Sequence, residues 1–400
     1  MAPEERPGSG RGAGEEVADA PRAGALPNRA MTHSVVFAAG GTGGHLVPAL
    51  AIAAALEKRA PGISISFVGT ARELDRTLIP AAGYRTYTTS VAPFSRSARG
   101  ALAAASMVPA TAQARRILRK ENASVVVGMG GYPSLPVVAA ARTLRVPALI
   151  HEANAIPGLA NSVAARMTHN IAVSFPETVG MFRGRKPRLV GLPLRDAIIR
   201  FDRQALRAEA LESFGLRPDL ETVLIFGGSL GAARLNEAAI GLAGRWSARE
   251  DVQMIVVTGS AHDADVRACI ELGKLTVRVL PFVQRMELAY AAADVGVSRA
   301  GASTVHELAV VGLPSVLVPL PIARRKEQHA NARMLTGVGA AKILEDADAT
   351  AERLDPVLGG LLADPTARAR MSDAARTVAR PDAAEAMADW ILQLAEARGA

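Results

Sequence analysis

The stretch VVFAAGGTGGHLVPALAIAAAL, residues 35–56, decides the fold of this chain. Its first residues are apolar and β-branched, as in a buried strand, and its last are rich in alanine and leucine, as in a helix. Two glycine pairs flank Thr42 between these parts, and His45 follows them where the helix should begin. A buried strand, a glycine turn and a helix predict the first unit of a parallel α/β sheet.

The same plan recurs along the chain. One series of short apolar runs comprises SVVFAAGG, SISFVGT, SVVVGMGG, PALIHE and NIAVSF, and a second comprises TVLIFGG, VQMIVVTG, TVRVLPF, VGVSR and PSVLVPL. The Pro/Gly/Arg-rich segment 183–195 between the two series suits a linker. The chain has 400 residues, 49% of them hydrophobic, which is enough for more than one core. We therefore predict an α/β protein with two domains, each built on a parallel sheet covered by helices.

The second series begins like the first. Aligning VLIFGGSLGAARLNEAAIGLA, residues 223–243, with the opening stretch pairs Gly227 with Gly40 and Ala232 with His45. Free N–H groups at a helix start attract anionic oxygen, so each turn predicts a phosphate or sugar site at the carboxyl ends of the strands. The two aligned stretches differ at His45, which has Ala232 as its counterpart. His45 is therefore the candidate catalytic residue. Neither turn has the pattern of a Walker loop or a dinucleotide loop, which disfavours a kinase, an ATPase or a dehydrogenase.

The amino-acid composition favours some classes of binding partner over others. The chain has 46 Lys and Arg against 38 Asp and Glu, and an excess that is mostly arginine suits phosphate or anionic lipid. Only 4% of the residues are aromatic and no basic tract is interleaved with them, so we predict no nucleic-acid partner. The single cysteine, Cys269, excludes an internal disulfide and favours a reducing cytoplasm. The first 30 residues lack the apolar run of a signal peptide, and no apolar run elsewhere approaches the ~20 residues of a membrane span.

Two Asp-x-Asp strings, Asp263-Ala-Asp265 and Asp346-Ala-Asp348, are candidates for a divalent metal site. The first lies at a predicted helix start, where acidic side chains cap the backbone and oppose the helix dipole. The second lies in a polar connector. We therefore predict no bound metal and no other cofactor.

Six stretches resemble, in order, the motifs of the MurG family of peptidoglycan glycosyltransferases. They are GGTGGH (40–45), GMGGYPS (128–134), HEANAIPG (151–158), GLPLR (191–195), GGSLGA (227–232) and RAGASTVHELAVVGLPSVLVPLP (299–321). The resemblance covers roughly residues 33–395. It implies the GT-B fold, two Rossmann-like domains with parallel sheets facing across a cleft. It also implies inverting transfer of N-acetylglucosamine from UDP-N-acetylglucosamine to the muramoyl 4-hydroxyl of undecaprenyl-diphospho-muramoylpentapeptide.

The resemblance also implies a division of the chain into four parts. They are a disordered tail over 1–31, an acceptor- and membrane-binding domain over 32–193, a donor-binding domain over 194–378, and a helix over 379–400 that returns to the first domain. Such a protein would lie at the cytoplasmic face of the membrane as a peripheral protein.

The reaction needs a base near the acceptor hydroxyl and positive potential near the leaving diphosphate. His45 suits the first task because an ordinary histidine titrates near pH ~6.5. A purely acceptor-positioning or helix-capping role for His45 stays open. Glu152, at a predicted strand end, is the rival base, and its alternative role is a structural ion pair.

Ser229, the GGSLGA backbone and the helix start after RAGAST suit the diphosphate. Glu307 is assigned to the ribose hydroxyls by the resemblance, and Arg195 either reaches a phosphate or pairs with Asp196. The full set of donor residues implied is Thr42, Gly43, Gly44, Asn154, Arg195, Ser229, Val283, Ala302, Ser303, Thr304, Val305, His306, Glu307 and Gln328. The acceptor residues implied are Gly131 and Tyr132.

The segment 94–120 places Leu102, Met107 and Val108 beside several arginines, Arg96, Arg99, Arg115 and Arg116. This pattern suits a patch on anionic lipid, and it equally suits an amphipathic helix packed on a sheet. The resemblance favours the membrane.

Two positions depart from the family pattern. Three cations, Arg324, Arg325 and Lys326, replace an acidic or glycine-containing turn near the donor, and Leu135 stands where a glycine is common, which we expect to crowd the acceptor side. Two alternatives therefore stay open: a UDP-sugar transferase acting on another lipid, and a nucleotide-sugar-binding protein without turnover.

Overall fold

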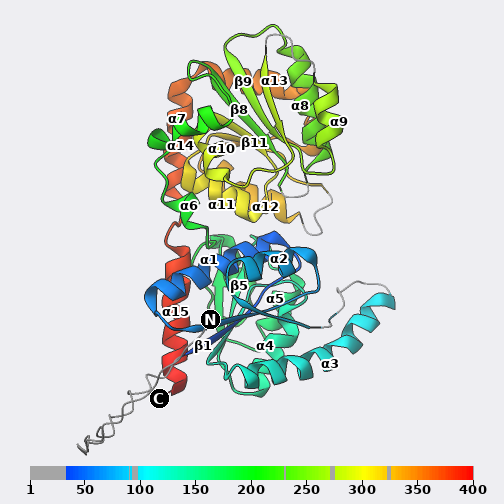
Figure 1. Ribbon diagram of the computed structural model, residues 1–400, viewed down its shortest axis with the longest axis vertical. Helices are drawn as coiled ribbons and strands as arrows, with labels where there is room; N and C mark the ends of the chain where they lie inside the picture. Colours follow the sequence, from blue (N-terminus) through cyan, green and yellow to red (C-terminus); the bar gives the residue numbers. More distant parts are fainter. Residues whose placement is uncertain are drawn as a thin grey trace, which may run out of the picture. The chain divides into compact units, whose positions relative to one another are not determined.

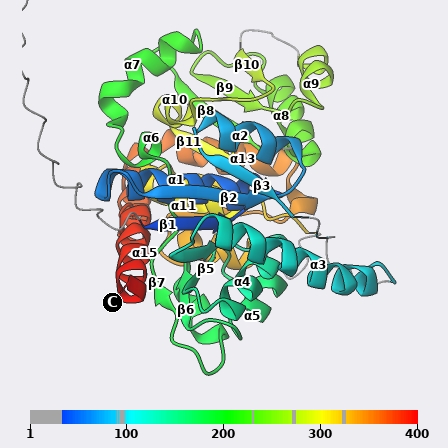
Figure 2. The same cartoon turned by 60° about the horizontal axis from the view of Figure 1, so that its bottom comes forward.

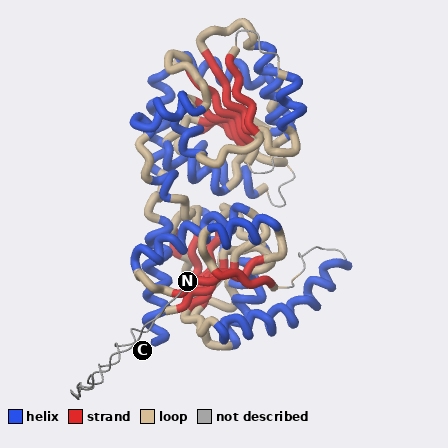
Figure 3. Tube along the Cα trace, in the orientation of Figure 1, coloured by secondary structure: helices blue, strands red, loops and turns tan. Residues whose placement is uncertain are grey.

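The computed structural model describes residues 33–89, 91, 98–228, 231–270, 275–321 and 326–399 (Figure 1). The tail predicted over 1–31 lies outside these residues. Within them, the chain forms two parallel sheets, each flanked by helices, as Figure 3 shows in red and blue. The predicted α/β class with two Rossmann-like domains is confirmed.

The N-terminal sheet has seven parallel strands among the described residues, in the order β3-β2-β1-β4-β5-β6-β7. The strands are β1 (Ser34–Ala38), β2 (Ser64–Gly69), β3 (Arg85–Thr88), β4 (Val125–Gly128), β5 (Ala148–Glu152), β6 (Asn170–Val173) and β7 (Arg188–Leu189). The helices of this part are α1 (Gly43–Arg59), α2 (Glu73–Ala81), α3 (Ala98–Lys120), α4 (Ser134–Thr143) and α5 (Leu159–Ala164), with the 3-10 helix η1 (Pro176–Met181).

The C-terminal sheet has six parallel strands in the part of the chain described, in the order β10-β9-β8-β11-β12-β13. The strands are β8 (Glu221–Phe226), β9 (Val252–Val257), β10 (Thr276–Leu280), β11 (Val295–Ser298), β12 (Ser315–Leu317) and β13 (Ala341–Ile343). The helical elements that follow β7 along the chain are α6 (Asp196–Ile199), α7 (Arg203–Ser213), α8 (Ala233–Arg245), α9 (Asp263–Cys269), α10 (Met286–Ala292), α11 (Ala302–Val311), α12 (Glu327–Thr336), η2 (Asp346–Asp348), α13 (Ala351–Ala363), α14 (Pro365–Thr377) and α15 (Ala383–Gly399).

Each sheet is buried on both faces, which explains its apolar strands. In β1, Val35 and Phe37 pack in one cluster with α1 and α15, whereas Val36 and Ala38 pack in another with α3 and α4. The same alternation holds in β8, whose neighbouring side chains enter separate clusters on the two faces. A strand covered on both sides reads as a continuous apolar run, and all ten predicted runs contain a strand.

Three strands, β3, β7 and β13, were not predicted. All three lie at sheet edges and expose part of their side chains, so none carries an apolar run that the sequence would reveal. Strand β7 lies inside segment 183–195, so part of the predicted linker is a strand that pairs with β6. The segment that follows β7 is also buried, through Leu192 and Leu194.

The last helix, α15, packs against α1 and β4 of the N-terminal sheet (Figures 1 and 2). Its apolar face enters the β1 cluster through Met387 and Ile391, which are fully buried. Arg59 of α1 forms ion pairs with two carboxylates of α15, Glu385 at 3.4 Å and Asp389 at 2.9 Å. These ion pairs add to the apolar packing between α1 and α15.

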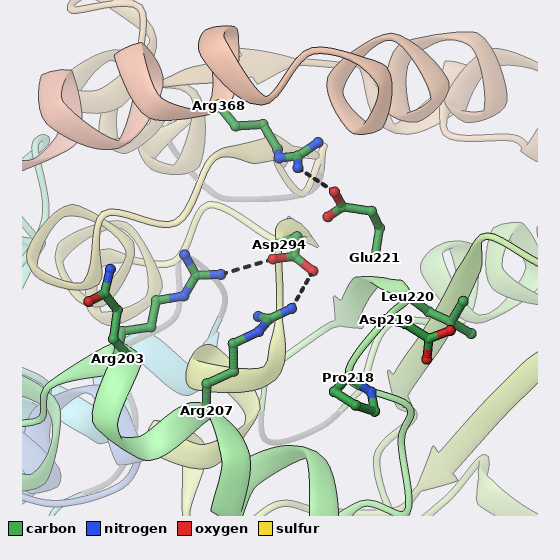
Figure 4. Close-up of a pocket in the computed structure, with 9 residues that line it drawn as sticks. Arg203, Arg207, Pro218, Asp219, Leu220, Glu221, Asp294 and Arg368 are labelled. Carbon is green, nitrogen blue, oxygen red and sulfur yellow. Dashed lines mark hydrogen bonds and ion pairs between the residues drawn. The ribbon is translucent and has the colours of Figure 1, made fainter.

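A network of arginines and carboxylates borders a cavity of about 360 Å³ at the amino ends of β8 and β11 (Figure 4). Asp294 accepts from Arg203 at 3.3 Å, from Arg207 at 3.0 Å and from the Thr222 N–H at 2.8 Å. Arg207 also bonds the last carbonyls of α10. This cavity lies at the opposite ends of the strands from the glycine turns, and its cations already hold helix ends and carboxylates, so we assign it to stability.

Replacing Asp294 with alanine is expected to lower the free energy of unfolding by about 2–4 kcal/mol, because two guanidinium groups and one N–H lose their acceptor in a partly buried site. Urea unfolding followed by circular dichroism measures this change. Asp219→Ala is the control, since that carboxylate is exposed and only meets Arg217 at the surface. A midpoint unchanged in both variants would contradict the assignment.

Candidate active site

The strand orders place the predicted motifs together. Strand β1 pairs with β4, and β8 pairs with β11, and at both places consecutive connections run to opposite sides of the sheet. Open α/β sheets bind ligands at such switch points, beyond the carboxyl ends of the strands. The GGTGGH and GMGGYPS turns follow β1 and β4, and the GGSLGA and RAGAST turns follow β8 and β11. The four motifs therefore occupy both switch points.

Helix α1 begins at Gly43, so His45 lies in its first turn and not at its start. The His45 Nδ1 lies 2.9 Å from the Thr42 hydroxyl, and no described residue hydrogen-bonds its Nε2. The imidazole is half-buried. Burial lowers the pKa of His45, and the nearby Asp75 carboxylate partly opposes this effect. The side chain is therefore neutral at neutral pH and has an available nitrogen.

The His45 ring packs against the turn that follows β4. Gly130 and Gly131 both have positive φ, 89° and 72°, which favours glycine. A methyl group added at Gly130 would lie 3.3 Å from His45 Nε2, and one added at Gly131 would lie 3.4 Å from its ring. The two predicted motifs thus meet directly, and the absence of side chains at the turn leaves room for the imidazole.

The surface in front of α1 is open. Thr42 and Gly44 are exposed, and a methyl group added at Gly43 or Gly44 would meet no atom within 4 Å. The helix has no acidic residue in its first turn, and no side chain caps its N–H groups. These groups are therefore available to an anionic or hydroxyl-bearing ligand.

Glu152 ends β5 and is 3% exposed. Its carboxylate accepts from the Asn154 N–H at 3.0 Å, the Gly158 N–H at 2.9 Å and the Asn161 side-chain amide at 2.9 Å. Burial raises the pKa of Glu152, and these hydrogen bonds oppose the rise. No cation contacts it among the described residues, so its contacts are not the ion pair considered above. Both oxygens are engaged in shaping the HEANAIPG loop.

The RAGAST motif contains the start of a helix, and this start has the features of an anion site. Helix α11 begins at Ala302 without a side-chain cap or an acidic residue in its first turn. Ala302, Ser303 and Thr304 are half-buried at this end. The macrodipole of this ten-residue helix and the free N–H groups at its start favour a phosphate there.

Two of the predicted donor residues in α11 turn inward. Val305 is fully buried, and His306 is 3% exposed. The His306 ring contacts the Ala302 carbonyl at 2.9 Å and the Ser174 carbonyl at 3.3 Å. Burial lowers the pKa of His306, and these two carbonyls oppose the change. Any contact of these two residues with a donor therefore involves their backbone.

Glu307, one turn into α11, is held by a partner that the sequence did not reveal. The hydroxyl of Tyr290, a fully buried residue of α10, donates to Glu307 Oε2 at 2.7 Å. Burial raises the pKa of Glu307, whereas Tyr290 and the positive charge of Arg195 lower it. Arg195 therefore lies near Glu307. Asp196 pairs with Lys58 and Arg200, so the predicted alternative of an Arg195–Asp196 pair is wrong.

Asn331 of α12 joins the HEANA and RAGAST loops. It is fully buried, its Oδ1 accepts from the Ala155 N–H at 2.9 Å, and its Nδ2 donates to Ala300 O at 3.2 Å and to Asn154 Oδ1 at 3.3 Å. Gln328, one turn earlier, accepts from the Leu320 N–H at 2.9 Å through its carbonyl oxygen. Asn154 and Gln328 thus flank the same region.

The remaining predicted residues divide by exposure. Tyr132 is half-buried and lies beside Gly41, since a methyl group added at Gly41 would be 3.7 Å from its ring. Val283 is 7% exposed and belongs to the core. Leu135 is 5% exposed and faces the core on α4, so the expected crowding of the acceptor side is wrong. Ser229, Arg324 and Arg325 lie outside the described residues.

The Asp-x-Asp strings have ordinary partners. Asp263 begins α9, as predicted, and pairs with Arg267 at 3.2 Å. Asp346 begins the short helix η2 and pairs with Arg299 at 2.5 Å. No group of three or more His, Cys, Asp or Glu side chains that would hold a metal occurs in the described part of the chain.

Comparison with known proteins identifies the class. A model of the glycosyltransferase family 28 N-terminal domain matches residues 35–173, and one of the glycosyltransferase family 28 C-terminal domain matches residues 222–387. With the two parallel sheets, these matches define a two-domain glycosyltransferase.

The relatives narrow this class. The sequence is 40% identical over 406 residues to the UDP-N-acetylglucosamine--N-acetylmuramyl-(pentapeptide) pyrophosphoryl-undecaprenol N-acetylglucosamine transferase of Mycolicibacterium paratuberculosis, covering 99% of this chain and 97% of that protein. The enzyme of the same name from Clavibacter sepedonicus is 40% identical, with 89% of this chain and 95% of that protein covered. The crystal structure of Acinetobacter baumannii MurG is 30% identical with a TM-score of 0.72, covering 90% of this chain and 99% of that one. This chain therefore belongs to the MurG family.

A more distant structure shows the fold alone. The UDP-GlcNAc 2-epimerase from Neisseria meningitidis bound to UDP-GlcNAc is 12% identical with a TM-score of 0.64, and it covers 91% of this chain. The two-domain scaffold is thus shared with proteins of different chemistry.

Proposed function

We propose that this protein transfers N-acetylglucosamine from UDP-N-acetylglucosamine to the muramoyl 4-hydroxyl of undecaprenyl-diphospho-muramoylpentapeptide, with inversion, in peptidoglycan synthesis. The observation that carries the proposal is the placement of four glycine-bearing motifs at the two switch points, with a neutral histidine at one and an uncapped helix start at the other. Family membership supplies the donor and the acceptor.

His45 acts as the base in this proposal. Its Nε2 takes the proton of the muramoyl hydroxyl as that oxygen forms a bond to the anomeric carbon. The bond from this carbon to the diphosphate oxygen breaks, and its electron pair leaves with UDP. In the tautomer that this step needs, Nδ1–H donates a hydrogen bond to the Thr42 hydroxyl oxygen, 2.9 Å away, which keeps the Nε2 lone pair available.

Most of the proposed donor residues lie in the C-terminal domain, residues 194–378. The N-terminus of α11, with Ala302, Ser303 and Thr304, receives the leaving diphosphate together with Ser229 and Arg195. Glu307 accepts from the ribose hydroxyls. The other donor residues proposed are Thr42, Gly43, Gly44, Asn154, Val283, Val305, His306 and Gln328.

The acceptor is held by the domain at residues 32–193. Gly131 and Tyr132 lie next to His45 and Gly41, where the muramoyl group would meet the base. Glu152 supports this side by fixing the HEANAIPG loop. Within the predicted segment 379–400, helix α15 (Ala383–Gly399) completes the N-terminal domain through its contact with α1.

The lipid-linked acceptor requires a membrane-facing surface, and we assign it to α3. The inner face of this helix is packed on the sheet through Ala114 and Leu118, as the packed-helix alternative expected. On the outer face, Val108 is 76% exposed, and Arg116 is exposed nearby without an ion-pair partner among the described residues. Apolar and cationic groups together suit the cytoplasmic face of an anionic membrane. Arg96, Arg99 and Leu102 belong to parts whose side chains lie outside the description. No described helix is long and apolar enough to cross a bilayer.

The double variant Val108→Asp, Arg116→Glu is expected to reduce binding to phosphatidylglycerol vesicles by about tenfold, because it removes an apolar contact and reverses a charge. Co-sedimentation with the vesicles measures this. Val338→Asp is the matched control, since Val338 is also exposed, at 39%, but lies in the C-terminal domain. Equal loss of binding in the control and the double variant would contradict the assignment to α3.

Release of UDP from UDP-N-acetylglucosamine tests the function. Turnover is expected with a short-chain muramoyl-pentapeptide diphosphate lipid and not with diacylglycerol. Turnover with diacylglycerol alone would favour another lipid acceptor. Binding of the nucleotide sugar without release of UDP in either assay would favour a binding protein.

A further inference from the structure

Asp75 of α2 is a fully buried carboxylate beneath the GGTGGH turn. Both of its oxygens lie 3.1 Å from the Gly41 N–H. Its Oδ2 also accepts from the Thr70 N–H at 2.8 Å and from the Thr70 hydroxyl at 2.6 Å. The carboxylate therefore ties the turn after β1 to the turn after β2, two adjacent strands of the sheet.

The backbone of the turn is fitted to this carboxylate. A methyl group added at Gly40 would lie 2.4 Å from Asp75 Oδ2, so only glycine lets the chain pass this close. From Gly41 the chain reaches Thr42, whose hydroxyl contacts His45, and then enters α1. Any shift of the turn is thus passed to the His45 ring.

Building on the proposed function, we infer that Asp75 is a positioning residue for the transfer reaction: its carboxylate fixes the Gly40–Thr42 turn and thereby the place of the His45 imidazole. Asp75 does not contact the reacting atoms itself. Buried carboxylates without a cation are costly, and this one is offset by N–H and O–H donors of two turns.

Several other titratable or charged groups surround His45, and Asp75 differs from them. Arg72 donates to the Gly41 carbonyl at 2.5 Å from the exposed side of the turn. His151 and Glu152 lie on β5, and the side chain of Tyr132 lies beside Gly41. The charge of Asp75 raises the pKa of His45 against the larger, opposite effect of burial. Removing this charge should lower the pKa of His45 further.

The variant Asp75→Asn tests the inference in the full-length protein. We expect kcat to fall ~10–100-fold, because a small displacement of the base is costly, while KM for UDP-N-acetylglucosamine stays within about threefold. The acidic limb of the pH profile of kcat/KM reports protonation of the base. Since the pKa of His45 falls in this variant, the limb should move to lower pH.

Two further variants serve as a second test and as a control for the role of Asp75. Thr70→Val removes one donor to Asp75 but keeps its charge, so kcat should fall ~3–10-fold with the acidic limb unmoved. Asp294→Asn alters a carboxylate of the remote arginine network and should change neither kcat nor the limb. If Asp75→Asn does not fold, Thr70→Val decides: wild-type kcat would overturn the inference, and the expected fall would support it.

A wild-type kcat and an unmoved limb in Asp75→Asn would overturn the inference. The inference would also be overturned if kcat falls, the acidic limb of kcat/KM stays in place and KM for UDP-N-acetylglucosamine rises in proportion. General distortion of the fold gives that combination of results. These outcomes leave the proposed function intact, since the unmodified protein would still transfer the sugar. Failure of the unmodified protein to release UDP would instead count against the proposed function.

Discussion

His45→Ala is expected to lower kcat by about a thousandfold, since general-base catalysis contributes 10²–10⁴-fold. Binding of UDP-N-acetylglucosamine should change little, because the imidazole meets the acceptor hydroxyl and not the nucleotide. Single-turnover transfer to a short-chain muramoyl-pentapeptide lipid measures the chemical step, and calorimetry with UDP measures donor binding. Undiminished turnover would remove His45 from the role of base.

The pH profile gives a second test of the same residue. Burial holds the pKa of His45 below its ordinary value, so the acidic limb of kcat/KM should lie below pH ~6.5. Activity falls as the pH drops through that pKa because the protonated ring accepts no proton. The limb should vanish in His45→Ala. A limb that persists unchanged in that variant would point to Glu152, whose pKa burial raises.

The geometry favours His45 over Glu152 as the base. The carboxylate of Glu152 accepts two backbone N–H donors from its own loop and the side-chain amide of Asn161 in α5, and it is 3% exposed. In contrast, no described residue bonds the Nε2 of His45. A base needs an unshared lone pair within reach of the substrate. Glu152 fits the description of a loop-shaping carboxylate, and its role is therefore exerted through the position of Asn154.

Glu307→Ala is expected to raise KM for UDP-N-acetylglucosamine by about 30–100-fold with a smaller change in kcat, because the ribose hydroxyls lose a charged hydrogen-bond acceptor.

Tyr290→Phe is expected to raise KM for UDP-N-acetylglucosamine by about threefold to tenfold. In this variant the Glu307 carboxylate stays but loses the hydroxyl, 2.7 Å away, that orients it. Initial rates over a range of donor concentrations measure both changes.

The matched control for Glu307 is Glu327→Ala. Glu327 is also a half-buried helical glutamate, but it lies at the start of α12. The KM of the Glu327→Ala variant for UDP-N-acetylglucosamine should remain close to that of the unmodified protein. Equal changes in KM for the two variants, or none for Glu307→Ala, would contradict the assignment of Glu307 to the ribose.

Much of this architecture is readable from local pattern. Short apolar runs predicted the inner strands of both sheets and the edge strand β10, because a strand buried on both faces needs apolar side chains at successive positions. The paired glycine turns and His45 predict a ligand site at the carboxyl ends of the strands, because parallel strands bring these ends to one edge. The motif resemblance named the family that the comparisons confirm.

The remainder depended on which distant segments meet. Edge strands such as β3 have half-exposed, mixed side chains, so only pairing with β2 makes them strands. Asp75 reads as an ordinary acidic residue of a helix first turn, and Tyr290 as an ordinary apolar position. Each becomes significant because folding buries it against a polar partner, Gly41 in one case and Glu307 in the other.

The sequence by itself therefore determined the α/β class, the two domains, the inner strands and the position of the glycine turns, since these follow from spacing along the chain. Only the tertiary structure decided that His45 keeps a free nitrogen, that Glu152 is committed to its loop, and that Asp75 lies beneath the turn. The physical reason is that hydrogen bonds and pKa values depend on burial and on neighbours far away in sequence, which no local pattern encodes.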